Sequence, residues 1–398
     1  MNDSLRVVVS GAGMIGAVHA AAIRAAGGEL AGVVASTPER SARAADEWGV
    51  PGRYPDFAAV LADDSVSVVH VCTPNALHVG QAEAALRAGK HVICEKPLAT
   101  TAVDAQRLTG LAREAGLVLA VPFVYRYHPL VREIRERRLR GEFGAWQLLH
   151  GSYLQDWMLS ENAMSWRVDP ADGGPSRAFA DIGSHWCDLV EWVTGVRFTT
   201  LTARLGTTVA TRPAGTGASF ATMGEGPRVR VRTEDVATVL LRTDGGVLGT
   251  LTVSQVSAGR KNRLWFELDG SAASAVFDQE SPETVWLGAP DGARVLVRDP
   301  NHGSAEQRRL SRLPAGHAQG YADCFNSFVA DAYAAIRGGA PEGLPTGEDG
   351  VRSARIVEAV LTSSASLTWV DVDTAPTAPV APTAPVAPTA LTALESTA

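Results

Sequence analysis

The segment that most constrains the fold is a glycine-rich turn close to the start of the chain. An apolar stretch at 5–10 leads into Gly11-Ala-Gly13-Met14-Ile15-Gly16, and an alanine-rich segment continues from 14 to 26. Glycines at these positions allow a tight strand-to-helix turn and let backbone N–H groups approach a diphosphate at the helix N-terminus. The turn therefore predicts a dinucleotide-binding unit, and a glycine-rich turn of some other α/β fold is the alternative.

Strand and helix patterns alternate after this turn as far as residue 121. Apolar strands are expected at 29–35, 66–71, 91–94 and 117–121, and helices at 38–48, 76–88 and 101–115. This alternation is typical of a parallel, doubly wound sheet, and apolar strands suit a sheet covered on both faces. We expect an α/β Rossmann domain at 1–125, and in this context the turn favours a nicotinamide cofactor.

The pattern changes after about residue 145, where strands follow one another closely. We expect them at 146–154, 199–205, 236–242, 247–253, 263–268, 273–277 and 284–287. Close spacing without intervening helices indicates a mostly antiparallel sheet. Helices are expected near 181–193, 321–337 and 349–367, the last two packing back on the first domain. Because 398 residues exceed one ordinary core, we expect an α+β domain at 126–373.

The last part of the chain, 374–398, is rich in alanine, proline and threonine and repeats an Ala-Pro-Xaa unit. Prolines at this density remove backbone donors and favour extended polyproline II. We expect a disordered tail without a catalytic role, and a tail that docks on a partner is the alternative.

The bulk composition argues against several classes of protein. A net charge of −7 without a basic block disfavours nucleic-acid binding, and no apolar run reaches membrane-spanning length. The first residues lack the pattern of an export signal. The four cysteines are scattered, so the sequence predicts neither a disulfide framework nor a metal site. We expect a reduced, cytoplasmic protein.

The end of the second strand bears on the choice of cofactor. An acidic residue there usually binds the ribose 2′-hydroxyl of NAD, but Ala35 and Ser36 stand at this place. Hydroxyls of Ser36 and Thr37, with Arg40 one turn on, suit a 2′-phosphate instead. The segment therefore favours NADP slightly and leaves NAD open, while a simple helix N-cap explains the same residues.

Polar residues also follow the third strand. Cys72-Thr73-Pro74-Asn75 closes that strand, and His78 lies one turn into the next helix. Ligands of such sheets bind outside the carboxyl ends of the strands, so we expect these residues to border the cofactor. Capping of the following helix by Thr73 or Asn75 explains them equally well and is compatible with binding.

Two further segments carry groups suited to catalysis. Glu95-Lys96-Pro97 follows the fourth strand, where a lysine can stabilise a developing alkoxide, although a surface ion pair gives the same pattern. Asp181 and His185 are four residues apart and share one helix face, with Asp188 three further on. A carboxylate beside an imidazole suits a general base. A structural helix cap is the alternative, and a metal site ranks low.

These motifs occur in one order: the glycine-rich turn, Cys-Thr-Pro-Asn, Glu-Lys-Pro and Asp-x-x-x-His. From about 5 to 372 the chain resembles the glucose–fructose oxidoreductase, inositol dehydrogenase and MocA (Gfo/Idh/MocA) family. The resemblance implies that Lys96 contacts the reacting hydroxyl and that Pro97 shapes the turn near the nicotinamide, often through a cis bond. It implies that Asp181 orients substrate and base, and that His185 exchanges the proton.

The resemblance also implies a substrate pocket and a substrate class. Residues on segments that border the pocket in relatives are Tyr125, Arg126, Tyr153, Asp156, Trp166 and Arg167. Val124 departs from the family, since many relatives have asparagine there, and this places close substrate analogy in doubt. The implied activity is NAD(P)-dependent oxidation or reduction of a sugar or cyclitol.

Two other activities remain open at this stage. One is an enzyme that retains NAD(P) and oxidises its sugar only transiently, such as an epimerase or a glycoside-cleaving enzyme. The other is a non-catalytic sensor that binds the cofactor, against which Lys96, Asp181 and His185 argue. By resemblance alone, we also expect a homodimer or homotetramer formed through the sheet of the second domain.

Overall fold

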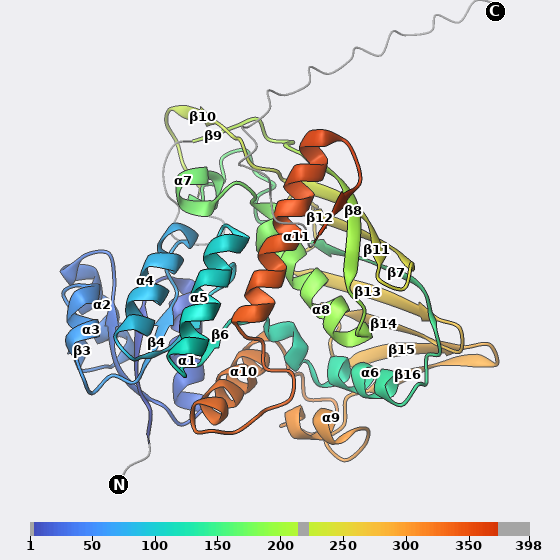
Figure 1. Cartoon of the computed structure of the whole chain (residues 1–398), viewed down its shortest axis with the longest axis horizontal. Coiled ribbons are helices and arrows are strands. Elements are labelled where there is room, and N and C mark those ends of the chain that lie inside the picture. Colours follow the sequence, from blue (N-terminus) through green and yellow to red (C-terminus); the bar gives the residue numbers. More distant parts are fainter. Residues whose placement is uncertain (1–3, 214–222, 373–398) are drawn as a thin grey trace, which may run out of the picture.

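The computed structural model describes residues 4–213 and 223–372, so the expected proline-rich tail lies outside the described residues. Figure 1 shows a smaller parallel sheet flanked by helices on the N-terminal side and a larger sheet on the C-terminal side, with α11 between them. The fold is therefore a Rossmann domain followed by an α+β domain, as the sequence predicted.

The N-terminal sheet is parallel and runs in the order β3-β2-β1-β4-β5-β6. Its strands are β1 Arg6–Ser10, β2 Glu29–Val34, β3 Gly52–Arg53, β4 Val68–Val71, β5 His91–Cys94 and β6 Leu119–Ala120. Its helices are α1 Met14–Ala25, α2 Pro38–Trp48, α3 Phe57–Ala62, α4 Asn75–Arg87 and α5 Ala102–Glu114. The strand order reverses between β1 and β4, which is where such sheets bind ligands.

Burial along β1 explains why this sheet forms. Val7, Val8 and Val9 are consecutive and completely buried, so helices cover both faces of the strand. Thr37 begins α2 and Thr101 begins α5, each accepting a backbone N–H of its first turn. Local sequence therefore sets both the strands and the helix starts that surround the sheet.

Within 4–213 and 223–372, the C-terminal sheet has nine strands in the order β16-β15-β14-β13-β7-β12-β11-β8-β17. They are β7 Trp146–Leu154, β8 Phe198–Gly206, β11 Val236–Thr243, β12 Leu248–Ser254, β13 Arg263–Gly270, β14 Ser274–Asp278, β15 Thr284–Ala289, β16 Gly292–Val297 and β17 Val370–Asp371. Neighbours are antiparallel except β7 and β12, which are parallel. A short separate pair joins β9 Thr211–Pro213 to β10 Arg228–Arg230.

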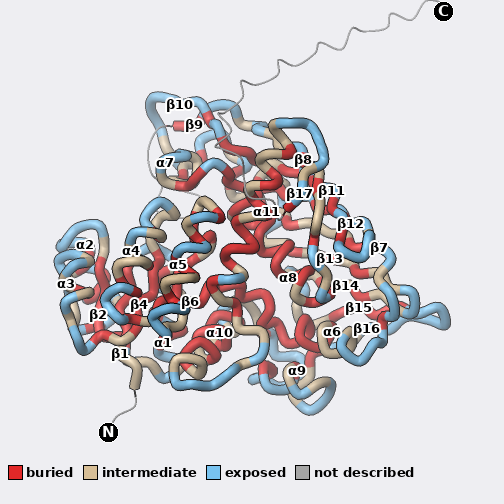
Figure 2. Tube along the Cα trace, in the orientation of Figure 1, coloured by how far each residue is buried: buried red, intermediate tan, exposed pale blue. Residues whose placement is uncertain are grey.

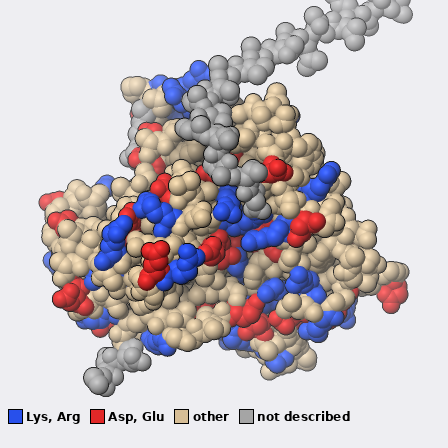
Figure 3. All heavy atoms as spheres, viewed as in Figure 1, with Lys and Arg blue, Asp and Glu red and all other residues tan. Residues whose placement is uncertain are grey.

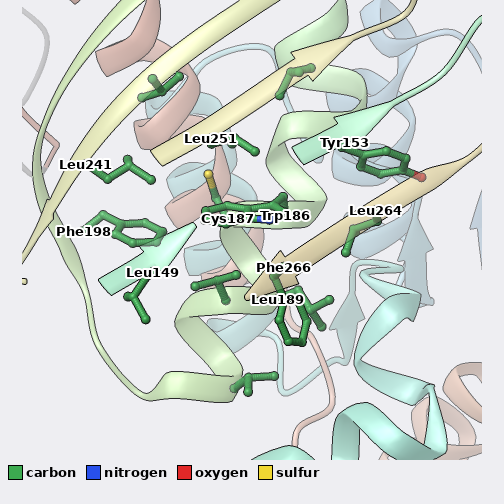
Figure 4. Packing of buried hydrophobic residues seen from close by; sticks show 14 of the residues in the cluster. Leu149, Tyr153, Trp186, Cys187, Leu189, Phe198, Leu241, Leu251, Leu264 and Phe266 are labelled. Atoms are coloured by element: carbon green, nitrogen blue, oxygen red, sulfur yellow. The ribbon is translucent and has the colours of Figure 1, made fainter. Parts of the chain in front are cut away.

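One face of this sheet packs on helix α8 (Ser184–Thr194). Figure 4 shows Trp186 of α8 among Leu149, Leu251 and Phe266, which project from three different strands. All four side chains are completely buried. Burial alternates along β11 with a period of two, so the opposite face of this strand meets solvent. Figure 2 shows the same division between the buried centre and the exposed outer strands.

The remaining helices connect the two sheets. They are α6 Pro129–Leu139, α7 Pro170–Gly173, α9 Ala305–Leu310, α10 Tyr321–Ile336 and α11 Gly347–Ser366. Phe328 and Tyr333 of α10 share a hydrophobic cluster with Ile23 of α1, and α11 packs against α5. The late helices therefore return to the first domain, as expected. Helix α6 and the short β3 and α3 were not expected from the sequence.

The distribution of surface charge and the hydropathy of the helices bear on whether the protein binds nucleic acid or spans a membrane. Basic and acidic side chains are interspersed on the face shown in Figure 3, without a continuous basic area. Among the described residues, no helix is both long enough and apolar enough to cross a membrane.

Candidate active site

A cavity of about 1060 Å³ lies at the carboxyl ends of the Rossmann strands and extends to the second domain. Most of the residues singled out in the sequence line it. These are Gly11, Gly13, Met14, Ile15, Ser36, Arg40, Cys72, Thr73, Pro74, Asn75, His78, Glu95, Lys96, Tyr125, Tyr153, Asp156, Trp166, Arg167, Asp181 and His185. Gly16, Thr37, Pro97 and Arg126 are not part of this lining. The folded chain thus gathers residues from both domains around one space.

The glycine-rich turn has the shape of a diphosphate cradle. A Cβ atom on Gly11, whose φ is +108°, would lie 2.4 Å from the carbonyl oxygen of Cys72, and one on Gly16 would lie 2.0 Å from that of Gly11. A Cβ on Gly13 would have no described atom within 4 Å, so this residue faces open space. Gly13 begins α1 without a side-chain cap, so first-turn N–H groups remain for an anion.

Basic residues gather where the ribose 2′ position of a dinucleotide is read in this fold. Ser36 and Arg40 line the cavity, and the Arg40 guanidinium donates to the Ser36 hydroxyl over 3.0 Å. Arg43, one turn along α2, also lines the cavity and was missed from the sequence. Thr37 instead caps α2, because its hydroxyl accepts from the Arg40 backbone N–H.

Residues after β4 and β5 tie the two domains together. Asn75 donates from its amide to the carbonyl of Gly173, the last residue of α7, over 2.8 Å. The ring nitrogens of His78 lie 2.8 and 2.9 Å from the carbonyl oxygens of Pro97 and Thr73. The Lys96–Pro97 peptide bond is cis. Pro97 contacts His78 through its carbonyl oxygen and does not line the cavity itself.

Lys96 and Asp181 form an ion pair across the domain boundary. The Lys96 ammonium donates to Asp181 Oδ1 over 2.6 Å and to the Asp181 carbonyl over 2.9 Å. Gln255 donates to Oδ2 over 2.8 Å, and Arg167 Nε lies 3.6 Å from Oδ1. Burial by itself raises the pKa of Asp181, but the charges of Lys96 and Arg167 outweigh it and lower that pKa below its usual range.

Asp181 lies in one turn of π-helix, Phe179–Gly183, which leads directly into α8. The carboxylate of Glu234 accepts the backbone N–H groups of Arg177 and Phe179 and so holds the start of this turn. A Cβ on Gly183 would lie 2.6 Å from the ring of Phe179, so a larger residue there would have to displace this buried ring. The predicted Asp-x-x-x-His helix is thus one π-turn carrying Asp181, followed by α8 carrying His185.

His185 stands in the cavity wall with an unpaired nitrogen. Its ring lies edge-on to those of Tyr125 and Phe123, with centroids 4.9 and 5.7 Å away. Its Nδ1 is buried and has no hydrogen-bond partner among the described residues. Burial, and then the charge of Lys96, hold the pKa of His185 well below its usual value, while Asp181 opposes this shift. The imidazole is therefore neutral near pH 7 and able to accept a proton.

A hydrogen-bonded group formed by Tyr125 and three residues of the second domain lines the far side of the cavity. The hydroxyls of Tyr125 and Tyr153 lie 2.5 Å apart, and Tyr153 donates to Asn262 Oδ1 over 2.7 Å. Gln155 donates to the same oxygen over 2.8 Å. Burial raises the pKa of Tyr125 to about 12, so its hydroxyl stays protonated. Gln155 and Asn262 were missed from the sequence.

Charged and aromatic side chains lie at the side of this wall. Lys261 pairs with Asp156 over 2.6 Å, and the Arg167 guanidinium lies 4.4 Å from the Trp166 ring centroid. Trp157, Asp172, Lys261 and Tyr321 also line the cavity and carried no local signal in the sequence. Planar rings beside polar groups suit a ligand that has both C–H faces and hydroxyls.

The structure places Arg126 away from the cavity, which corrects its expected place beside a substrate. Its guanidinium donates to Asp188 Oδ2 over 2.8 Å and to Asp349 Oδ1 over 2.6 Å. Arg126 therefore joins α8 to the start of α11, and Asp188 is its partner. Gly16 is likewise a packing residue of the glycine-rich turn, because the Gly11 carbonyl occupies the space beside it.

One group of potential metal ligands occurs elsewhere. Among the described residues, His150, Glu267 and Asp269 bring ligand atoms within 4.8 Å of one another on β7 and β13. None of the three lines the cavity, so they contribute nothing to the site described above.

Family models match both parts of the chain. The model described as "Oxidoreductase family, NAD-binding Rossmann fold" matches residues 5–123, and that of the GFO/IDH/MocA C-terminal domain matches residues 131–276. The chain belongs to the GFO/IDH/MocA oxidoreductase family. The resemblance inferred from the motifs is thereby confirmed, and the chain is an NAD(P)-dependent oxidoreductase that acts on CH–OH groups.

Individual relatives of this GFO/IDH/MocA protein extend over most of its length. A levoglucosan dehydrogenase of Pseudarthrobacter phenanthrenivorans is 32% identical over 351 residues, 85% of this chain and 88% of the relative. A solved levoglucosan dehydrogenase in complex with NADH and levoglucosan has a TM-score of 0.84 at 29% identity, covering 94% of this chain and 100% of its own. An inositol dehydrogenase homologue from Azotobacter vinelandii, complexed with NAD⁺, has a TM-score of 0.82 at 27% identity, covering 92% and 97%.

Proposed function

We propose that this protein transfers hydride reversibly between NADP(H) and a ring hydroxyl or ketone of a sugar or cyclitol. The observation that carries the proposal is the shared cavity in which Lys96, Asp181 and His185 meet beside the glycine-rich turn. When bound, the nicotinamide accepts or supplies the hydride. The similarity to levoglucosan dehydrogenase supports a carbohydrate substrate.

The charge state of each of the three residues determines its proposed role. Neutral His185 accepts the hydroxyl proton as the alcohol is oxidised and returns it in the reduction. The Lys96 ammonium stabilises negative charge on the same oxygen, a contribution that is worth most in a site shielded from water. Asp181 fixes the ammonium over 2.6 Å and thereby orients both groups toward one substrate oxygen.

The substrate wall supports a polyol rather than an apolar alcohol. Tyr125, Tyr153, Gln155 and Asn262 form a connected hydrogen-bonded set, and such sets recognise hydroxyl groups at fixed positions. Trp166 supplies a ring beside them that suits the C–H face of a pyranose or cyclitol.

A direct assay tests this proposal. Purified protein is incubated with NADP⁺ or NAD⁺ and a panel of anhydrosugars, pyranoses and inositols while the absorbance of the reduced cofactor is followed. We expect net reduction with at least one of them, and roughly a 100-fold or greater loss of kcat in His185→Asn. Absence of turnover across the panel in both directions would refute the proposal. Turnover without net reduction would show an enzyme that retains its cofactor.

The preference for NADP rests on the two arginines of α2. Arg40 and Arg43 are exposed, line the cavity and lie on one face of the helix, where a 2′-phosphate gains charge-assisted hydrogen bonds. We expect Arg40→Ala/Arg43→Ala to raise the Kd of NADP⁺ roughly 10-fold or more and to leave that of NAD⁺ nearly unchanged. Arg53→Ala is the control, because Arg53 pairs with Asp46 outside the cavity.

The same proposal includes a homodimer or homotetramer formed through the open face of the large sheet. Leu148, Leu240 and Leu248 are exposed on that face, and Leu148 and Leu248 are neighbours across β7 and β12. Light scattering of the purified protein tests it, and a monomer at micromolar concentration would contradict it.

A further inference from the structure

Four polar side chains are buried in a row beneath Lys96 and take no part in the mechanism above. Glu95 Oε1 lies 3.0 Å from His19 Nε2, and His19 Nδ1 lies 2.8 Å from His70 Nδ1. His70 Nε2 lies 3.1 Å from the hydroxyl of Tyr333. At its outer end, Glu95 Oε2 accepts the backbone N–H of Lys96 over 3.1 Å. The row therefore connects α10, β4 and α1 to the lysine.

The chemistry of these atoms allows one arrangement of protons when both imidazoles are neutral and Glu95 is a carboxylate. A carboxylate only accepts, so His19 carries its proton on Nε2 and its Nδ1 is an acceptor. His70 must then donate from Nδ1, which leaves its Nε2 to accept from the Tyr333 hydroxyl. Each donor meets one acceptor, and each successive donation points toward Glu95.

The surroundings fix this arrangement. His19, His70 and Tyr333 have no solvent exposure, and Glu95 retains only 7% at the cavity wall. Burial, and then the neighbouring His19, hold the pKa of His70 well below its usual value, so this imidazole stays neutral. The Tyr333 ring packs against Gly28, where a Cβ would lie 2.8 Å from it. A buried row of this kind is stable only when every member is paired.

We infer that Tyr333, His70 and His19 form a one-way hydrogen-bond chain that keeps Glu95 an oriented carboxylate, and that Glu95 thereby positions Lys96 for catalysis. The inference rests on the role proposed above for Lys96. The chain does not carry protons to solvent, because Tyr333 at its inner end is completely buried. In this hydrogen-bond chain, Glu95 and His19 are positioning residues and do not touch the reacting atoms.

The tautomers of the two histidines test the chain directly. NMR of the full-length protein labelled with ¹⁵N-histidine, recorded without substrate, distinguishes an imidazole protonated on Nδ1 from one protonated on Nε2. We expect the Nε2–H form for His19 and the Nδ1–H form for His70. In Glu95→Gln the side-chain amide donates to His19 while its carbonyl accepts from Lys96, so both tautomers should reverse.

Tyr333→Phe tests whether the chain matters for catalysis. It removes only the first donor and keeps the ring, and we expect kcat to fall roughly three- to tenfold, the equivalent of one net hydrogen bond, with KM nearly unchanged. Tyr127→Phe is the matched control, because Tyr127 is equally buried and its hydroxyl has no hydrogen-bond partner among the described residues. It should leave kcat and both tautomers as in the original protein.

Two results would overturn the inference. One is a wild-type spectrum with either histidine in the opposite tautomer or doubly protonated. The other is equal kcat for Tyr333→Phe and Tyr127→Phe. Because the spectrum needs no turnover, failure of the chain is distinguishable from failure of the proposed sugar oxidoreduction, which would leave the tautomers as expected.

Discussion

Replacing Lys96 by methionine separates the structural role of its ion pair from its chemical role. Lys96 Nζ lies 2.6 Å from Asp181 Oδ1, and the two side chains are only 14% and 12% exposed. At that distance and an effective dielectric constant of about 20, the attraction is about 6 kcal/mol, and desolvation of both charges offsets much of it. Methionine keeps the apolar stem and leaves the Asp181 carboxylate buried without its ammonium.

We expect Lys96→Met to lower the free energy of unfolding by about 3 kcal/mol, the lower end of the range for breaking a buried pair. Arg167 and Gln255 still contact Asp181, over 3.6 and 2.8 Å, and limit the loss. In Lys96→Met/Asp181→Asn neither charge of the Lys96–Asp181 pair is left, and the Arg167 guanidinium loses only a contact of 3.6 Å, so most of that stability should return. Activity should not return, because removal of one such charge costs roughly 100- to 1000-fold in kcat.

Lys261→Met is the matched control for this experiment. Lys261 pairs with Asp156 at the same 2.6 Å, but its side chain is 77% exposed, so the loss should be below about 1 kcal/mol. Urea unfolding without cofactor, followed by tryptophan fluorescence, measures the free energy of unfolding of the three variants and of the unsubstituted protein. The reasoning is wrong if Lys96→Met and Lys261→Met lose equal stability, or if the double variant is no more stable than Lys96→Met.

Two other predictions concern the same cavity. Burial and Lys96 lower the pKa of His185 well below its usual value, while Asp181 opposes them. The value of kcat/KM for alcohol oxidation should therefore stay flat at and above pH ~6.5, the usual histidine pKa, and fall only well below that pH. Lys96→Met should move this acid limb to higher pH and Asp181→Asn to lower pH, and a limb that both variants move in one direction would contradict the assignment. Gly16→Ala should abolish cofactor binding measured by fluorescence titration, since its Cβ meets the Gly11 carbonyl at 2.0 Å. Gly80→Ala in α4, with no described atom within 4 Å, should bind normally and gain roughly 0.5 kcal/mol in stability.

The Rossmann half was predictable because its signals are local. Consecutive apolar residues such as Val7 to Val9 indicate a strand covered on both faces, and Thr37 or Thr101 marks a helix start within a few residues. Helix α6 (Pro129–Leu139) was missed for the opposite reason. It buries Arg132 and Glu133. Arg132 pairs with Glu306 and Glu342, which are distant in sequence, and Glu133 pairs with Arg137 of the same helix. Charged residues therefore interrupt the buried face, and no apolar stripe identifies the helix.

The candidate site also contains residues that local motifs predict and residues that they do not predict. Lys96 and His185 lie in short motifs at predictable places, and the fold brings them to one cavity. Gln155, Gln255 and Asn262 come from strand ends or loops of the large sheet, and nothing near them in the sequence distinguishes them from amide side chains elsewhere in the chain. Their placement depends on which strands are neighbours in the nine-stranded sheet, which composition and periodicity do not determine.

The displacement of Arg126 from the cavity follows from the geometry of one short turn. Val124–Tyr127 is a 3₁₀ turn, in which three residues complete one revolution, so adjacent side chains diverge by about 120°. Tyr125 therefore points into the cavity while Arg126 points toward Asp188 and Asp349. Asp188 lies one turn beyond His185 on α8, so the Arg126–Asp188 pair links the turn that carries Tyr125 to the helix that carries His185. Arg126 thus holds the elements around the cavity together without lining it, and its position in the sequence beside Tyr125 gives no indication of that.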